Sequence, residues 1–310
     1  MPVLDEESHV ESALASVLTQ DYPGPLDVFV ALGPSRDGTD EIVRRVAIGD
    51  SRVTTVPNPS GGRCSGLNAA IRAANGEVVV RVDARSILPS GYVERAVETL
   101  LRTGAANVGG VQRAVGNSPF TEAVADALSS PFGMGGARYR TGGREGAVDT
   151  VFLGAFEREA LVAAGLFDES LVGNEDYELN VRLRRDGGIV WFDPSLSVDY
   201  TPRPTLGALA RQYANYGAWK RRVVRLHPTS LRPRQMVPPV VLLALMAAVA
   251  LAPWQPLTLL APAAYALAVG LAAVATSRRP SRIIRLLTIF PTMHLAWGAG
   301  FLVGRGRARR

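Results

Sequence analysis

Residues 66–86 read GLNAAIRAANGEVVVRVDARS and decide the fold class, because a helix signal, a turn and a strand signal follow one another. A helix is predicted over 65–75, since Gly76 is a typical residue just past a helix end. The apolar run that follows predicts a strand over 77–82, which stops at Asp83. Ligands of α/β sheets bind at the carboxyl ends of the strands. Asp83 is therefore a candidate binding residue.

The same alternation continues on both sides of this stretch. Helices are predicted over 6–20, 39–48 and 91–103, and strands over 26–32 and 53–56. Thr39 is expected to cap its helix. The pattern predicts an α/β domain with a mostly parallel sheet covered by helices. The segment that begins at Pro2 is expected to be the loop after a first strand, which would precede Pro2.

Composition excludes several classes of protein. The chain has 310 residues, 47% of them hydrophobic, which is too apolar for a disordered chain. The single cysteine, Cys64, excludes a disulfide-built scaffold and a zinc-finger or iron–sulfur site. The three histidines, His9, His227 and His294, are too scattered along the sequence to indicate a His-rich metal site.

Charge is distributed very unevenly along the chain. Residues 1–199 hold all 28 acidic residues and 18 of the 34 basic ones, whereas residues 200–310 hold 16 basic residues and no acid. The basic half is also apolar: 237–254 and 257–276 carry no charge, and 286–304 carries only His294. Runs of this length are typical of membrane-spanning helices. The bases cluster around the apolar runs, which favours a membrane and argues against nucleic acid.

Three zones follow: a soluble domain over 1–204, a basic aromatic connector over 205–235 and a membrane domain over 236–310. Arginines precede the apolar run 237–254 and follow the apolar run 257–276, and no charged residue lies between the two runs. The positive-inside rule therefore predicts a hairpin of two spans with both basic flanks in the cytoplasm. A multi-pass protein of the inner cell membrane with a cytoplasmic domain is expected. The segment 286–304 either spans or is re-entrant. If it spans, four arginines lie outside the cell, namely Arg305, Arg307, Arg309 and Arg310.

Five motifs occur in one order along the chain: PVLDEE, PSRDGTDEIV, GLNAAIRAANGEVVVRVDARS, NEDYELNVRLRRDGG and RQYANYGAWK. In this order they resemble the family 2 glycosyltransferases, and most of all the membrane-bound succinoglycan-type glucosyltransferases of exopolysaccharide synthesis. The segments NVGG (107–110) and FGMGGARYR (132–140) extend the resemblance.

The resemblance implies a GT-A fold, a Rossmann-like α/β domain followed by transmembrane helices. It also implies inverting transfer of a hexose from a nucleotide diphosphate sugar to a lipid-linked saccharide acceptor, in exopolysaccharide or cell-envelope glycan synthesis. Two alternatives stay open. Polyprenyl phosphate itself is the acceptor, or the chain is a catalytically degenerate membrane scaffold.

Inverting transfer requires a carboxylate that removes the proton of the acceptor hydroxyl. Asn174-Glu-Asp-Tyr-Glu places Glu175, Asp176 and Glu178 at the start of a helix predicted over 175–185, where acids also suit the helix dipole. The resemblance implies that Asp176 is the base and that Glu175 acts beside it. The alternative is an acidic first turn of purely structural use.

Asp83-Ala-Arg85 stands where the family has Asp-x-Asp. The resemblance implies that Asp83 contacts the donor and holds a divalent metal, Mg²⁺ or Mn²⁺. Arg85 replaces the acid that usually binds the metal, and a guanidinium has no lone pair to donate. Metal dependence is therefore left open. Arg85 either pairs with the donor diphosphate in place of part of the metal's charge or is a surface loop residue.

Other residues are assigned to the donor or the acceptor by resemblance alone. The remaining donor-binding residues implied are Pro2, Asp5, Glu6, Asp37 and Asn68. On the connector, Tyr213, Tyr216 and Trp219 recur at every third position, which also fits a packed or interfacial helix face. The implied acceptor-binding residues are Gln212, Tyr216 and Trp219. Their spacing departs from the Gln-x-x-Arg-Trp motif of processive synthases, so polymer synthesis is not expected.

Overall fold

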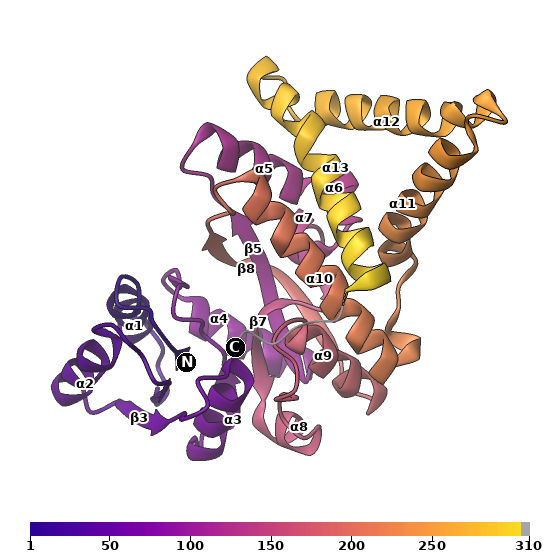
Figure 1. The fold of residues 1–310 in the computed structure, drawn as a ribbon. Coiled ribbons are helices and arrows are strands. Elements are labelled where there is room, and N and C mark those ends of the chain that lie inside the picture. The colour runs from indigo at the N-terminus through magenta and orange to yellow at the C-terminus, as the bar shows by residue number, and fades with distance from the viewer. Residues whose placement is uncertain (305–310) are drawn as a thin grey trace. The chain divides into compact units, whose positions relative to one another are not determined.

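The computed structural model describes residues 1–304, and the four arginines predicted to lie outside the cell fall beyond this range. The chain divides into two compact units (Figure 1). Unit 1 contains residues 1–112 and 142–199, and unit 2 contains residues 113–141 together with the chain from Tyr200 onward. The segment 113–141 therefore belongs with the C-terminal helices, although the expected domain over 1–204 included it.

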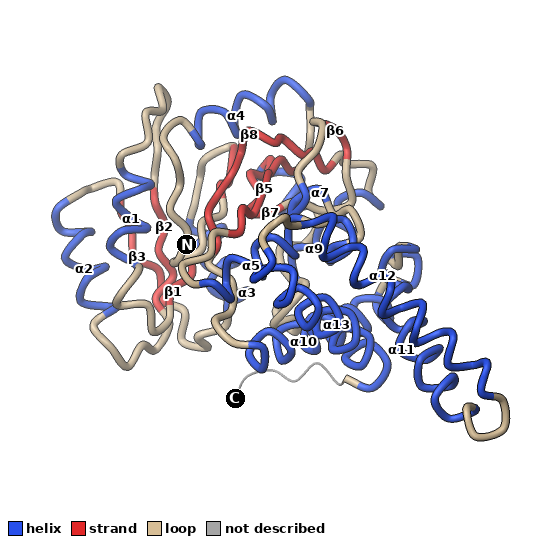
Figure 2. Tube along the Cα trace, turned by 90° about the horizontal axis from the view of Figure 1, so that it is seen from above, coloured by secondary structure: helices blue, strands red, loops and turns tan. Residues whose placement is uncertain are grey.

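The first half of unit 1 is a small parallel sheet in the order β1-β2-β3. Its strands and their helices are β1 (Pro2–Val3), α1 (Val10–Leu18), β2 (Val28–Leu32), α2 (Thr39–Gly49), β3 (Val53–Pro57) and α3 (Arg63–Ala73). In Figure 2, α1 and α2 lie beside the three strands. The helices bury Leu14, Val17 and Val43 in a core shared with Val30. Pro2 and Val3 pair with Ala31 and Leu32, so this segment is itself a strand and not the expected loop.

The second sheet has the order β4-β7-β5-β8-β6. Its strands are β4 (Val78–Val80), β5 (Asn107–Ala114), β6 (Gly146–Ala147), β7 (Phe152–Glu157) and β8 (Val190–Tyr200). Antiparallel pairing joins β4 to β7, β5 to β7 and β6 to β8. The α/β fold is confirmed, but only the first sheet is parallel throughout, so the two sheets together are mixed. Three further helices complete unit 1: α4 (Tyr92–Thr103), α8 (Arg158–Ala163) and α9 (Glu175–Arg185).

Unit 2 is helical. Its elements are α5 (Pro119–Ser129), α6 (Pro131–Met134), α7 (Arg138–Thr141), α10 (Leu206–Leu226), α11 (Pro233–Leu251), α12 (Leu260–Thr276) and α13 (Pro280–Val303), with 3₁₀ turns at Pro228–Ser230 and Pro256–Leu259. Side chains of α5, α10, α12 and α13 form its core, which includes Leu128, Leu209 and Phe290. Arg282 at the start of α13 pairs with Asp126 at 3.0 Å and Glu122 at 2.6 Å, both on α5.

Three helices of unit 2 are long and apolar enough to cross a membrane: Pro233–Leu251, Pro256–Thr276 and Pro280–Val303. They make the chain a membrane-associated protein. In the first two, only 11% of the most apolar window is buried within the protein, so most of their apolar surface is open for lipid. The third is one helix through Pro291. It contains nearly all of the predicted segment 286–304.

The helices α10 and α13 approach each other at backbone distance. A methyl group added to Gly300 would come within 1.9 Å of the Ala214 carbonyl oxygen, and one added to Gly217 would come within 2.1 Å of the Trp297 carbonyl oxygen. Small residues at such crossings allow membrane helices to pack closely. Glycine is therefore required at both positions for the contact between α10 and α13.

Candidate functional site

The candidate site in unit 1 begins at the first turn of α9. Asn174 caps this helix in the left-handed conformation, at φ 59°, and Glu175 is the first helical residue. The acidic side chains that follow lie in the positive field of the helix N-terminus. Glu178 binds Arg182 one turn later, with 2.7 Å between Oε2 and Nη2. The pair between Glu178 and Arg182 stabilises α9 from within. Glu175 and Asp176 are therefore the remaining candidates for a catalytic role in this turn.

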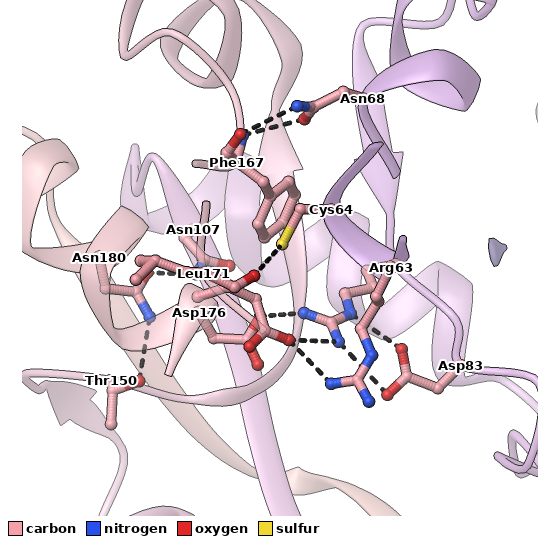
Figure 3. Close-up of polar contacts among 12 residues, drawn as sticks. Arg63, Cys64, Asn68, Asp83, Asn107, Thr150, Phe167, Leu171, Asp176 and Asn180 are labelled. Carbon is pink, nitrogen blue, oxygen red and sulfur yellow. Dashed lines mark hydrogen bonds and ion pairs between the residues drawn. The ribbon is translucent and has the colours of Figure 1, made fainter. Parts of the chain in front are cut away.

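Arg81 joins the acidic residues of two segments. Its side chain is 3% exposed, and its Nε lies 2.9 Å from Oδ1 of Asp83. Its Nη2 lies 3.4 Å from Oε1 of Glu175, and its Nη1 donates to Oδ1 of Asp176. In Figure 3, Asp83 and Asp176 lie on opposite sides of the arginine side chains. One buried guanidinium thus connects the carboxyl end of β4 with the N-terminus of α9.

Glu175 is fixed between two cations. Nη1 of Arg63, at the start of α3, lies 3.0 Å from the same Oε1 atom that Arg81 contacts. The Glu175 side chain is only 4% exposed. A buried carboxylate with two guanidinium partners is closed to a bulky ligand, and in this structure it holds Arg63 and Arg81 in place.

Asp83 and Asp176 are the accessible carboxylates of the cluster, with side chains 32% and 39% exposed. Burial raises the pKa of Asp176 to about 7, and the neighbouring charges of Glu175 and Asp83 add to this effect while Arg81 opposes it. For Asp83 burial acts in the same direction, but Arg81 and Arg63 outweigh it and lower its pKa. The two carboxylates therefore have different chemistry: Asp83 stays charged, and Asp176 exchanges a proton near neutral pH.

Polar side chains hold the far side of α9 in place. Asn180 Oδ1 accepts a hydrogen bond of 2.7 Å from the amide of Asn107, and its own amide donates to Thr150 at 3.1 Å (Figure 3).

Cys64 on α3 lies 3.1 Å from the Leu171 carbonyl oxygen. Burial raises the pKa of the Cys64 thiol to about 12, so it is an unreactive structural residue.

Asp5 and Asp37 hold two loops together at the ends of β1 and β2. Asp5 accepts a hydrogen bond from the Arg36 amide at 2.8 Å, and Asp37 accepts one from the Glu7 amide at 3.1 Å. Asp37 also accepts from the Thr39 hydroxyl at 2.5 Å, which lowers the pKa of Asp37. Gly38, and not Thr39 as predicted, occupies the cap position of α2.

Glu6 and Arg85 lie together, as two donor-binding candidates from different loops. Nε of Arg85 lies 2.8 and 2.7 Å from the two carboxylate oxygens of Glu6, and the Arg85 side chain is 61% exposed. A diphosphate that binds Arg85 would therefore have to displace Glu6 from this ion pair.

Pro2 lies in β1 and pairs with Ala31 of β2. It packs against Gly66 of α3, where an added methyl group would lie 3.0 Å from Pro2 Cβ.

Asn68 is buried and is bonded within unit 1. Its amide nitrogen donates to the Phe167 carbonyl and to Glu169, both at 2.9 Å, and its amide oxygen accepts from the Phe167 amide at 3.0 Å (Figure 3). These bonds connect α3 to the segment after α8. In this structure the side chain supports the fold beside the ionic cluster.

The acceptor candidates lie on α10 in unit 2. Gln212 Nε2 donates to the hydroxyls of Tyr200 at 2.9 Å and Tyr216 at 3.0 Å. Trp219 is 5% exposed, and the guanidinium of Arg222 lies 5.8 Å from its ring centroid. The structure therefore brings Gln212 and Tyr216 together with Tyr200, while Trp219 is packed within the unit.

The protein's own groups near Asp83 do not by themselves complete a site for a divalent metal. Within residues 1–304 no three or more His, Cys, Asp and Glu side chains are placed to hold one ion. Asp83 is paired with Arg81 and has no second carboxylate at the position of Arg85. Hard cations require several oxygen ligands, so a metal here would depend on oxygens supplied by a ligand.

Arg81 is the site residue that sequence reasoning missed. A signal was present, because an arginine interrupts the apolar run predicted as a strand over 77–82. A buried arginine needs anionic partners. Asp83, two residues further along, is one of the partners found, whereas Glu175 and Asp176 lie 94 and 95 residues away and no local pattern pairs them with Arg81.

Comparisons with known proteins concern the family and the fold of the chain. Residues 1–163 match the profile of "Glycosyl transferase family 2". The succinoglycan biosynthesis protein ExoA of Rhizobium meliloti (strain 1021) is 34% identical over 97% of this chain and 92% of its own. A dolichyl N-acetyl-alpha-D-glucosaminyl phosphate 3-beta-D-2,3-diacetamido-2,3-dideoxy-beta-D-glucuronosyltransferase of Methanococcus voltae is 22% identical over 73% of each chain.

A solved structure shares the fold over nearly the whole length. The mannosyltransferase PcManGT from Pyrobaculum calidifontis, in complex with GDP-Man and Mn²⁺, matches with a TM-score of 0.62 and 23% identity. The match covers 96% of this chain and 84% of that one. It supports the GT-A fold predicted from the sequence.

Proposed function

Because the chain belongs to glycosyl transferase family 2, we propose that it is an inverting hexosyltransferase. It moves a hexose from a nucleotide diphosphate sugar to a lipid-linked saccharide acceptor in exopolysaccharide or cell-envelope glycan synthesis. The relative with 34% identity is named for succinoglycan biosynthesis. The more distant relative is named for a transferase acting on a dolichyl phosphate-linked sugar. The first name supports a role in exopolysaccharide synthesis, and the second supports a lipid-linked acceptor.

The observation that carries the proposal is the partly open carboxylate of Asp176, whose pKa is raised to about 7. In the proposed reaction Asp176 takes the proton from the acceptor hydroxyl as that oxygen attacks the anomeric carbon. The bond from that carbon to the diphosphate breaks, and the nucleoside diphosphate leaves. A base with a pKa near the working pH is best suited to this step. Glu175 positions Arg63 and Arg81 around it.

Asp83 is proposed to contact the donor, since it lies at the carboxyl end of β4 and stays ionised. Arg63 and Arg85 are the exposed cations of the two ionic groups, with side chains 53% and 61% exposed. They are proposed to supply positive charge to the departing diphosphate, Arg63 from its place beside Glu175 and Arg85 by exchanging Glu6 for phosphate oxygens. The solved mannosyltransferase contains Mn²⁺ with its donor. Here the arginines around Asp83 argue for a smaller contribution from a metal.

The membrane helices are proposed to anchor the enzyme in the inner membrane with the catalytic unit in the cytoplasm. Arginines flank the hairpin of α11 and α12 on both sides, as the positive-inside rule requires. Arg282, in the second flank, binds Glu122 and Asp126 of α5. Through this contact α5 is held at the cytoplasmic end of α13.

The experiment is sugar transfer in membranes that contain the full chain. A panel of radiolabelled nucleotide sugars is offered to a lipid extract, with and without chelator. We expect one donor to label lipid, and Asp176→Asn to reduce the rate at least about a hundredfold while donor binding stays. The matched control is Asp186→Asn at the other end of α9, whose partner is the exposed Arg185, and it should keep the parental rate.

Transfer by Asp176→Asn within about tenfold of the parent would contradict the assignment of the base. Absence of labelled lipid with every donor would contradict transfer to a lipid-linked acceptor. Purified polyprenyl phosphate as the sole acceptor distinguishes the alternative acceptor, because transfer to it should be absent if a lipid-linked saccharide is required. Complete loss of transfer in chelator would show that a metal, and not the arginines, supplies most of the positive charge to the diphosphate.

A further inference from the structure

Unit 2 contains a buried arginine whose charge is not neutralised. Arg140 on α7 is 7% exposed, and its Nε and Nη1 atoms have no hydrogen-bond partner within residues 1–304. Two aromatic rings face its guanidinium: the Tyr200 ring centroid lies 4.9 Å away and that of Tyr139 lies 5.7 Å away. The arginine is thus enclosed by ring faces, which offer no acceptor for its N–H groups.

Burying the Arg140 guanidinium in this way is energetically unfavourable for the protein without a ligand. Removing a guanidinium from water is costly, and a cation–π contact offsets only part of that cost. An anion that accepts hydrogen bonds from the guanidinium would offset the rest of the cost. Unit 2 cannot supply one, because Glu122 and Asp126 are its only acidic residues, and both bind Arg282.

The polar groups around Arg140 offer donors. Gln212 is the donor in its bond with the Tyr200 hydroxyl, so that hydroxyl keeps its own hydrogen for another acceptor. Tyr216 receives the second bond from Gln212. Burial raises the pKa of Tyr216 to about 12, with Arg140 opposing the effect, so its hydroxyl stays neutral. Guanidinium and phenol donors that gather without a carboxylate favour an anion with several acceptor oxygens.

We infer that Arg140, with Tyr200, Gln212 and Tyr216, binds the phosphate or diphosphate of the lipid-linked acceptor. The inference rests on the proposed function and names the part of the acceptor that is recognised. A guanidinium binds phosphate through two parallel N–H bonds, and both Nε and Nη1, which have no hydrogen-bond partner in the described part of the chain, can form such a pair with the Nη2 that lies between them. The nucleotide donor carries the same chemistry. The acceptor is favoured because α7 and α10 belong to the unit that contains the candidate membrane helices.

Binding to small probes tests the inference without any transfer reaction. The full chain in detergent micelles is titrated with farnesyl diphosphate, with farnesol, and with UDP and GDP, and its melting temperature is followed. We expect farnesyl diphosphate to stabilise the parent and Arg140→Met to bind it at least about tenfold more weakly, which is about 1.4 kcal/mol. Arg140→Lys should keep part of the affinity, and farnesol should not distinguish the variants. Arg211→Met, at an exposed position of α10 next to Gln212, should match the parent.

The melting temperature without ligand separates a binding role from a structural one. If Arg140 awaits an anion, Arg140→Met should melt at the parental temperature or above, because an unpaired buried charge is removed. A lower melting temperature without ligand would make Arg140 a packing residue and overturn the inference. Unchanged affinity for farnesyl diphosphate would also overturn it, and weaker binding of UDP or GDP in its place would assign Arg140 to the donor.

Kinetics of transfer give a second readout. Arg140→Met should raise the KM for the lipid acceptor and leave the KM for the nucleotide sugar unchanged. If no lipid is labelled by the parent, the proposed function fails while the probe titration still decides the role of Arg140. If the parent transfers sugar and Arg140→Met has the parental acceptor KM, the inference fails and the proposed function stands.

Discussion

Arg81 in unit 1 and Arg140 in unit 2 are both buried, at 4% and 7% exposure, yet their surroundings differ in one respect. Arg81 contacts three carboxylates, those of Asp83, Glu175 and Asp176. Arg140 contacts the rings of Tyr139 and Tyr200. The first arginine is part of a neutralised network, and the second depends on an anion from outside the chain.

The difference follows from the distribution of acids along the sequence. All 28 acidic residues lie within residues 1–199, so unit 1 can neutralise a buried cation from its own chain. Beyond Asp199 there is no acid, and the two in segment 113–141 are used by Arg282. A cation retained without a counter-ion indicates ligand binding, whereas a cation inside an acidic cluster first indicates structure.

The largest expected effect comes from breaking the neutralised network. Arg81→Met leaves three carboxylates close together without their shared cation, and should destabilise unit 1 by roughly 3–5 kcal/mol. Thermal unfolding of the full chain measures it. Arg52→Met is the control, because Arg52 forms only a half-exposed pair with Asp50 and a bond to the Leu18 carbonyl at the end of α1, and its melting temperature should stay close to the parental one. If Arg81→Met unfolds no earlier than Arg140→Met, the contrast between the two arginines is wrong.

A smaller effect is expected from the close packing of helices within unit 2. Gly300→Leu forces α10 and α13 apart, since even a methyl group at Gly300 would lie 1.9 Å from the Ala214 carbonyl oxygen. Overpacking of this kind costs roughly 1–3 kcal/mol. Gly270→Leu on α12 is the matched control, because a methyl group there would meet nothing within 4 Å. Equal melting temperatures of the two variants in detergent would contradict the close crossing.

Local signals explain what the sequence could predict. The helix predicted over 175–185 is observed at Glu175–Arg185, because an acidic first turn and a basic last turn mark both of its ends. Asp83 was predicted at the end of a strand, and it lies three residues after Val80, where β4 ends. These features depend on neighbours in sequence, as the hydrophobic runs of the membrane helices do.

Long-range pairing explains what the sequence could not predict. The order β4-β7-β5-β8-β6 joins strands far apart in the chain, and no local pattern specifies which strand lies beside which. The partners of Arg81 come from residues 83 and 175–176, so a buried arginine could be noticed but not paired. The same holds for Asn68, whose bonds reach Phe167 and Glu169.

The central claim is that Asp176 removes the acceptor proton, and the pH dependence of kcat/KM tests it most directly. The base acts only when unprotonated, and burial raises the pKa of Asp176 to about 7. As pH falls below about 7, kcat/KM for the lipid acceptor should therefore fall, approaching about tenfold per pH unit, and it should be level above. The residual activity of Asp176→Asn should show no such fall. A parental profile that is flat from about pH 5 to about pH 8, or an Asn variant that keeps the same fall, would contradict the account.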